Sequence, residues 1–107
     1  MAGRKPKAET YPKPEIDLDR SFGPNLRYWR KKRGFSQQRL AELAEVHRTE
    51  VGLLERGKRE PKFGIINKLA GALQIEQAEL FRGISFAPSE TGEGHFIYDP
   101  YDPRSAP

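Results

Sequence analysis

The segment from Ser36 to Gly57 constrains the fold more than any other part of the chain, because its pattern predicts two short helices separated by a tight break. Ser36 can accept a backbone hydrogen bond as the N-cap of the first helix. Leu40, Leu43 and Ala44 then follow at helical spacing. The sequence therefore predicts a short amphipathic helix that begins directly after Ser36.

The second helix of this segment carries a separate apolar stripe. Val46 lies in the break, Val51 and Leu54 give the stripe, and Gly57 can adopt the left-handed conformation that ends a helix. Helices this short cannot bury their own apolar faces, so neighbouring elements must hold them. The outer face of the second helix is then left free to contact another molecule.

Other residues within and around this segment extend the pattern. They are Leu26, Trp29, Arg30, Gly34 and Phe35 ahead of Ser36 and Gln37; Leu40, Ala41 and Val46; Val51, Leu54 to Lys58 and Pro61; and Leu69, Ala70, Ala72, Leu73, Ile75, Leu80 and Phe81. With these residues, Phe22 to Phe81 resembles the Cro and phage-repressor type of helix-turn-helix domain. The resemblance covers 60 of the 107 residues and implies an all-α, compact five-helix bundle.

The predicted bundle has two flanking tails. Residues 1–20 contain three prolines and a basic run at Gly3–Lys7, which predicts a flexible arm that lies along DNA or is simply solvated. Residues 21–85 form the predicted domain. Residues 86–107 are acidic and repeat Tyr-Asp-Pro, which predicts a flexible tail, although His95–Tyr98 could add a strand or bind a groove.

Apolar spacing places the outer helices of the predicted bundle. The first should begin near Ser21 or Phe22 and end at Gly34. Its buried stripe is predicted to be Phe22, Leu26 and Trp29. A fourth helix has an apolar face, and a short fifth helix should end at Leu80 and Phe81. The predicted face of the fourth helix consists of Phe63, Ile66, Leu69, Ala70 and Leu73.

Charge and composition narrow the classes of function. Residues 21–85 carry thirteen basic and seven acidic side chains, whereas residues 86–107 carry one and four. A basic domain favours phosphate polyanions, although the charge alone fits a solubility surface equally well. The chain has no apolar run of the ~20 residues needed to span a bilayer and no signal-peptide core, so a cytoplasmic protein is expected. Without cysteine or a catalytic or metal-binding constellation, we predict neither an enzyme nor a cofactor or metal site.

The family resemblance implies which residues read DNA bases. It places the helix from about His47 to Leu54 in the major groove of double-stranded DNA. His47, Arg48, Thr49 and Leu53 then face the groove. Arg48 is the strongest candidate for reading a base, because a guanidinium can donate two parallel hydrogen bonds to guanine. The alternatives are a phosphate contact for Arg48 and a helix-capping or phosphate-facing role for His47.

The resemblance also implies phosphate contacts and one structural ion pair. The expected phosphate contacts are Gln37, Gln38, Lys58, Arg59 and Lys62. Contacts of this kind fix the register of a protein on DNA but do not read its sequence. Arg30 and Glu55 match positions that pair between the first helix and the end of the recognition helix in similar domains.

Four residues depart from the family pattern. Glu45 and Gln74 stand where glycine is customary, Glu76 replaces a good N-cap, and Gln77 replaces a usually apolar residue. A left-handed backbone at Glu45 costs roughly 1 kcal/mol or more, so a reshaped turn is expected there. The geometry of the fifth helix is expected to change as well.

Together these patterns predict a sequence-specific transcriptional regulator. It is expected to bind a palindromic operator as a homodimer, in the bacterial cytoplasm at the nucleoid, and to be encoded by a bacterium or a phage. The rival hypothesis is an antitoxin or adaptor-type interaction module whose C-terminal tail binds a protein partner.

Overall fold

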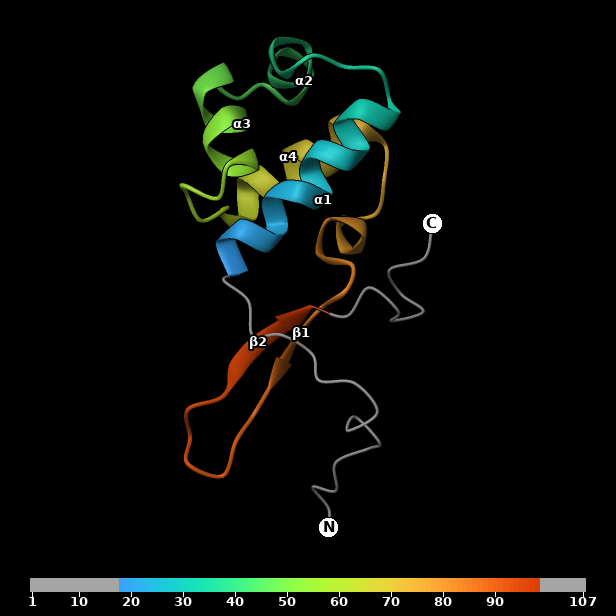
Figure 1. Cartoon of the computed structure of the whole chain (residues 1–107). Coiled ribbons are helices and arrows are strands. Elements are labelled where there is room, and N and C mark those ends of the chain that lie inside the picture. Colours follow the sequence, from blue (N-terminus) through green and yellow to red (C-terminus); the bar gives the residue numbers. More distant parts are fainter. Residues whose placement is uncertain (1–17, 99–107) are drawn as a thin grey trace.

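The computed structural model of the chain describes residues 18–98, and the side chains from residue 21 onward. In this part, four α-helices and a 3-10 helix form a bundle, and a two-stranded sheet extends from it (Figure 1). The elements are α1 (Leu18–Lys32), α2 (Gln37–Ala44), α3 (Arg48–Glu55), α4 (Phe63–Leu73), η2 (Gln77–Phe81), β1 (Ile84–Ala87) and β2 (His95–Tyr98).

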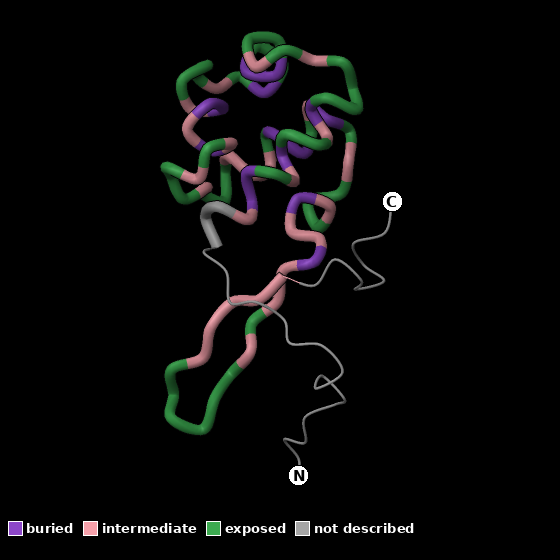
Figure 2. The backbone as a smooth tube through the Cα atoms, viewed as in Figure 1, coloured by how far each residue is buried: buried purple, intermediate pink, exposed green. Residues whose placement is uncertain are grey.

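The apolar core lies where all the helices meet. Phe22 and Leu26 of α1 are almost completely buried, and every other helix adds buried apolar side chains (Figure 2). These are Leu40, Ala41, Ala44, Val51, Leu54, Leu69, Ala70, Leu73 and Leu80. Because no pair of helices could enclose this core alone, the stability of each helix depends on the whole bundle.

Several details of the predicted helices are wrong. α1 begins at Leu18, earlier than the predicted Ser21 or Phe22. Leu43 and Phe63 fit the apolar spacing of α2 and α4 but are exposed, Phe63 to 76%. Phe63 is the first residue of α4 and so lies at the edge of the core, where spacing alone does not bring about burial.

Two of the helices end at a residue with left-handed backbone that is not glycine. Glu45 after α2 and Gln74 after α4 both have φ of 58°. The next residue in each case is apolar and donates its N–H to the helix, Val46 to the Ala41 carbonyl at 3.0 Å and Ile75 to the Ala70 carbonyl at 3.1 Å. The expected reshaping of the turn is therefore wrong, because these backbone bonds keep the helix-ending geometry despite the Cβ.

Replacing Glu45 with glycine is expected to raise the free energy of unfolding by about 1 kcal/mol, because glycine adopts a left-handed backbone without the Cβ penalty. Urea denaturation monitored by circular dichroism gives this value. Glu42→Gly is the matched control in the same helix. Glu42 lies in regular helix, so glycine there should lower stability by about 0.5–1 kcal/mol. If both variants changed the free energy of unfolding in the same direction, the strain at Glu45 would be contradicted.

The fifth helix differs from the expectation. Residues Gln77–Phe81 form a 3-10 helix, and its N-cap residue Glu76 makes no side-chain capping bond. The predicted all-α bundle of five helices is therefore right only in its helical class, because the described residues form four α-helices, this 3-10 helix and a two-stranded sheet. Asn25 of α1 holds this segment in place by donating Nδ2 hydrogen bonds to the carbonyls of Leu80 at 2.9 Å and Arg82 at 3.2 Å.

A β-hairpin follows the bundle. β1 pairs with β2 in antiparallel register, with Ser85 opposite Ile97 and Phe86 opposite Phe96. The Phe86 and Phe96 rings lie 5.3 Å apart in an edge-on arrangement. The expected flexible tail thus does not hold for residues 86–98, and the predicted boundary after residue 85 falls inside β1. Most of the predicted N-terminal arm, residues 1–17, and the rest of the tail, residues 99–107, lie outside the described residues.

Candidate nucleic-acid interface

α3 is buried on one side and open at its N-terminal end. Val51 and Leu54 are buried in the core, whereas His47, Arg48 and Thr49 are exposed. A helix held from behind in this way presents its first turn to solvent. Polar and cationic side chains at that turn are free to contact another molecule.

His47 caps α3. Its Nδ1 accepts a hydrogen bond from the backbone N–H of Thr49 at 3.1 Å. An imidazole that accepts at Nδ1 carries its proton at Nε2 when neutral, so Nε2 remains a donor. The capping alternative for His47 is therefore the one that the geometry shows, and it fixes where α3 begins.

An ion pair fixes the other end of α3. Arg30 of α1 donates from Nε to Oε2 of Glu55 at 2.6 Å and from Nη2 to Oε1 at 3.0 Å, the pair that the sequence predicts. Arg30 also donates from Nη1 to the Phe35 carbonyl at 2.9 Å. The hydrogen bonds to Glu55 raise the pKa of Arg30 above its ordinary value, against the opposing effect of burial. The Arg30 and Glu55 side chains are only 11% and 4% exposed, so solvent screens the pair little.

Gln37 belongs to the same network. Its Nε2 donates to Oε1 of Glu55 at 3.1 Å, so the amide expected at a phosphate is directed into the protein. The neighbouring Gln38 donates from Nε2 to Oε2 of Glu42 at 3.1 Å. The first turn of α2 still has backbone N–H groups without partners inside the helix. These groups, more than the side-chain amides, are what α2 can offer to an anion.

Two glycines near this network, Gly23 and Gly52, were not identified from the sequence as packing residues. A Cβ on Gly23 of α1 would lie 2.4 Å from the Glu55 carbonyl oxygen and 2.7 Å from that of Leu54. Gly52 is buried as well, and a Cβ there would lie 3.1 Å from Nη1 of Arg56 and 3.6 Å from Oε1 of Gln37 in α2. Glycine in the middle of a helical pattern is the signal that could have found both.

The loop after α3 carries the remaining cations of the prediction. Lys58, Arg59 and Lys62 are all exposed. Arg59 donates from Nη1 to Oε1 of Glu50 at 2.8 Å, which ties the loop to α3. The backbone N–H of Lys58 bonds to the Leu53 carbonyl at 2.9 Å. Of these three residues, Lys58 and Lys62 therefore have the most openly exposed cationic groups.

The structure thus leaves most of the predicted residues exposed along α3 and in the loop that follows it. Arg48 and Thr49 lie at the start of α3, Leu53 is half-buried along it, and the lysines follow its end. Glu55, the last residue of α3, is already neutralised by Arg30. The surface therefore has an excess of positive charge and suits a polyanion.

No helix in the described part of the chain is long and apolar enough to cross a membrane.

Comparison with known proteins gives one family and several relatives. The sequence model of a family described as helix-turn-helix matches residues 26–80. A prophage-derived, uncharacterized HTH-type transcriptional regulator of Bacillus subtilis, YonR, is 36% identical over 62 residues, which are 58% of this chain and 57% of that protein. The match thus spans little more than half the length of this relative.

Solved structures show the same similarity. The restriction-modification controller protein C.AhdI from Aeromonas hydrophila is 47% identical, with a TM-score of 0.57 over 58% of this chain and 94% of that one. The biofilm regulator SinR, in a structure that contains DNA, is 27% identical, with a TM-score of 0.54 over 55% of this chain and 95% of that one.

Proposed function

Because this chain belongs to the helix-turn-helix family, we propose that it is a DNA-binding transcriptional regulator that places α3 in the major groove. The observation that carries the proposal is the exposure of Arg48 and Thr49 at the start of a helix whose opposite face is buried. A major groove admits one helix, and the N-terminal residues of such a helix reach the base edges.

The exposed side chains form two groups, one that contacts bases and one that contacts phosphates. Arg48 reads a base, with guanine as the best match for two parallel donors, and Thr49 offers a hydroxyl and a methyl group. His47 contributes its Nε2 donor, and Leu53 contributes an apolar contact. DNA phosphates on either side of α3 are bound by Lys58, by Lys62 and by the backbone N–H groups of Gln37 and Gln38. Arg59 joins them while it keeps its bond to Glu50.

We further propose that the protein binds as a homodimer to a palindrome. Two-fold symmetric helix-turn-helix proteins bind half-sites about one helical turn, ~10 bp, apart. The named relatives support this type of function: one is a controller protein, one is a transcriptional regulator, and SinR was solved with DNA. Such a regulator would act in the cytoplasm, at the nucleoid.

Selection of bound sequences from a random DNA pool tests the role of Arg48. Arg48→Ala is expected to lose about 1–3 kcal/mol of discrimination at one base position of each half-site, because the bidentate contact is removed. Arg39→Ala is the matched control. Arg39 is an exposed arginine of α2 whose side chain bonds to Glu42 and whose backbone N–H bonds to Ser36 Oγ, so loss of the side chain should leave the base preference unchanged.

The two levels of the proposal can fail separately. If Arg48→Ala selects the same sequences as the wild-type protein, the assignment of Arg48 is wrong although DNA binding stands. If the wild-type protein enriches no sequence at low salt, the regulator proposal itself is overturned. Circular dichroism of both variants confirms that a change in selection is not a loss of fold.

A further inference from the structure

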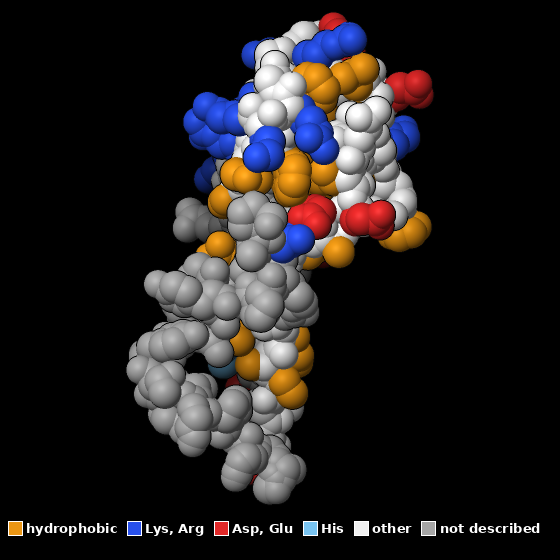
Figure 3. Space-filling model, turned by 90° about the vertical axis from the view of Figure 1, so that its right-hand side faces the viewer, with side chains coloured by type: hydrophobic (Ala, Val, Ile, Leu, Met, Phe, Trp, Pro, Cys, Tyr) orange, Lys and Arg blue, Asp and Glu red, His pale blue; other side chains and the backbone are white. Residues whose placement is uncertain are grey.

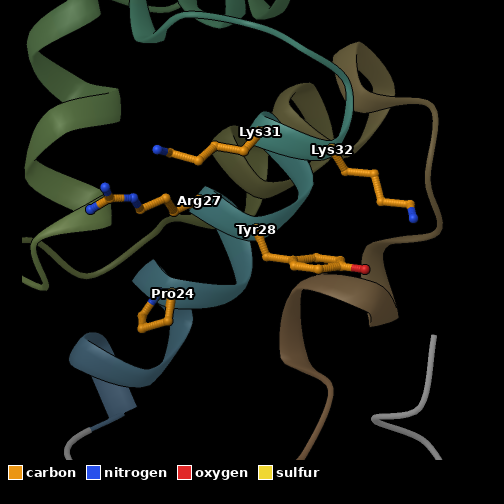
Figure 4. A pocket seen from close by; sticks show the side chains of 5 residues that line it. All are labelled: Pro24, Arg27, Tyr28, Lys31 and Lys32. Carbon is orange, nitrogen blue, oxygen red and sulfur yellow. The ribbon is translucent and has the colours of Figure 1, made fainter.

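α1 carries a basic surface that the proposed DNA contacts do not use. Five residues line a shallow, open depression of about 590 Å³, and none of them is acidic: Pro24, Arg27, Tyr28, Lys31 and Lys32. We call these five residues the α1 basic surface. Figure 4 shows Arg27 and Lys31 extending to one side of α1, and Tyr28 and Lys32 extending to the other.

The aromatic ring of Tyr28 lies among the cations of this surface. Tyr28 is 47% exposed, which is high for so large an apolar ring. The ammonium group of Lys32 lies 6.0 Å from the centre of the Tyr28 ring. On the face of the bundle seen in Figure 3, lysine and arginine side chains border exposed hydrophobic ones. Such a surface suits a partner that offers both an apolar side chain and carboxylates.

The hairpin of this chain, residues 84–98, offers both. We call this segment the arm. Phe86 of β1 is 53% exposed, and Glu90 and Glu93 are exposed in the turn that joins the strands. The arm contains no lysine or arginine. Its turn is ordered, since Ser89 Oγ accepts a hydrogen bond from the Glu93 N–H at 3.1 Å.

The far end of the arm points away from its own bundle, although Tyr98 at its base lines a neighbouring depression together with Pro24 and Tyr28. Figure 1 shows the strands leaving the bundle beyond η2, with the turn at the far end, and Figure 2 shows that this turn is exposed. The carboxylates at the tip therefore do not face the α1 basic surface of the same chain. A lone two-stranded hairpin is marginally stable in water, so packing of the arm against another surface would stabilise it.

We propose that the arm of one copy docks on the α1 basic surface of a second copy. Phe86 packs on Pro24 and Tyr28, while Glu90 and Glu93 face the cations of that surface. The reciprocal contact forms at the same time, because a two-fold dimer uses the same pair of surfaces twice. This docking specifies the interface of the proposed homodimer. It therefore rests on the homodimer in the proposed function, but not on DNA recognition.

Charge reversal tests this interface in the full-length protein. The arm variant carries Glu90→Lys and Glu93→Lys, and the surface variant carries Lys31→Glu and Lys32→Glu. Each variant alone opposes like charges, so its dimer dissociation constant in sedimentation equilibrium should rise at least about tenfold. The control, Glu60→Lys with Glu76→Lys, changes two other exposed glutamates and should leave that constant unchanged.

Mixing the two variants gives the sharper test. In a heterodimer of the arm variant and the surface variant, both contacts again join opposite charges, so dimers should return in the mixture. Unchanged dissociation constants, or no recovery on mixing, would overturn the docking and leave the α1 basic surface to DNA or to another protein. A wild-type protein that is monomeric at all concentrations would overturn the dimer as well. Binding of that monomer to a single half-site would still support the regulator.

Discussion

Replacing Glu55 with alanine is expected to lower the free energy of unfolding by about 3 to 5 kcal/mol, which is a large part of the stability of a domain this small. Glu55 accepts three hydrogen bonds, two from Arg30 and one from Gln37. Without it, the buried Arg30 guanidinium keeps only its bond to the Phe35 carbonyl. The loss comes from leaving a charge buried without a counter-charge, more than from the energy of the pair itself.

Two comparisons separate this explanation from a general effect of losing a glutamate. Glu42→Ala removes a carboxylate that is 52% exposed and pairs with Arg39, so its cost should be below about 1 kcal/mol. Arg30→Met combined with Glu55→Leu removes both buried charges and should recover most of the stability lost in Glu55→Ala. Thermal and urea denaturation give all three values. A double variant as unstable as Glu55→Ala would contradict the argument from unpaired charge.

Replacing Gly23 with alanine is expected to lower the free energy of unfolding by about 1–3 kcal/mol, although alanine favours a helix more than glycine does. The new Cβ would lie 2.4 Å from the carbonyl oxygen of Glu55. Both groups belong to the backbone of packed helices, so no side chain can turn aside to relieve the overlap. α1 and the end of α3 must move apart.

Gly71→Ala is the matched control for Gly23→Ala. Gly71 lies inside α4, and a Cβ there would meet nothing within 4 Å. Alanine should therefore raise stability by about 0.4–1 kcal/mol at this position. Denaturation curves of the two variants should shift in opposite directions. A stabilised Gly23→Ala protein would show that α1 and α3 are not in tight contact.

Both predictions concern the attachment of α3 to α1. Arg30, Glu55 and Gly23 hold the end of α3 in place and are not among the proposed DNA contacts. A variant at one of these positions that still folds should therefore bind DNA less well, because its recognition helix is held less firmly. This separates residues that position the recognition helix from those proposed to contact DNA. Arg48→Ala should change base preference at full stability, whereas Gly23→Ala should weaken binding to all sequences alike.

The sequence by itself determined the elements that local chemistry specifies. Helical spacing and the N-cap at Ser36 predicted α2, whose capping bond is the one from Arg39 N–H to Ser36 Oγ at 2.9 Å. The same spacing gave the apolar stripes of α3 and α4, and the family resemblance placed α3 at about His47 to Leu54, within a residue of its bounds Arg48–Glu55. The family resemblance added the pairing of Arg30 with Glu55, which joins residues 25 positions apart and which no local pattern contains. The assignment of Arg48 as a base-reading residue remains a prediction.

Only the tertiary structure decided which competing local preferences prevail. Glu45 and Gln74 keep left-handed backbones because packing and the bonds of the next residues outweigh the steric cost of a Cβ. Gln37 turns towards Glu55 because a buried carboxylate needs a donor. The arm forms although its sequence is rich in turn residues, since it depends on cross-strand pairs such as Phe86 and Phe96, whose register the composition does not show. Interactions of this kind have no periodic signature, because they depend on which surfaces the bundle brings together.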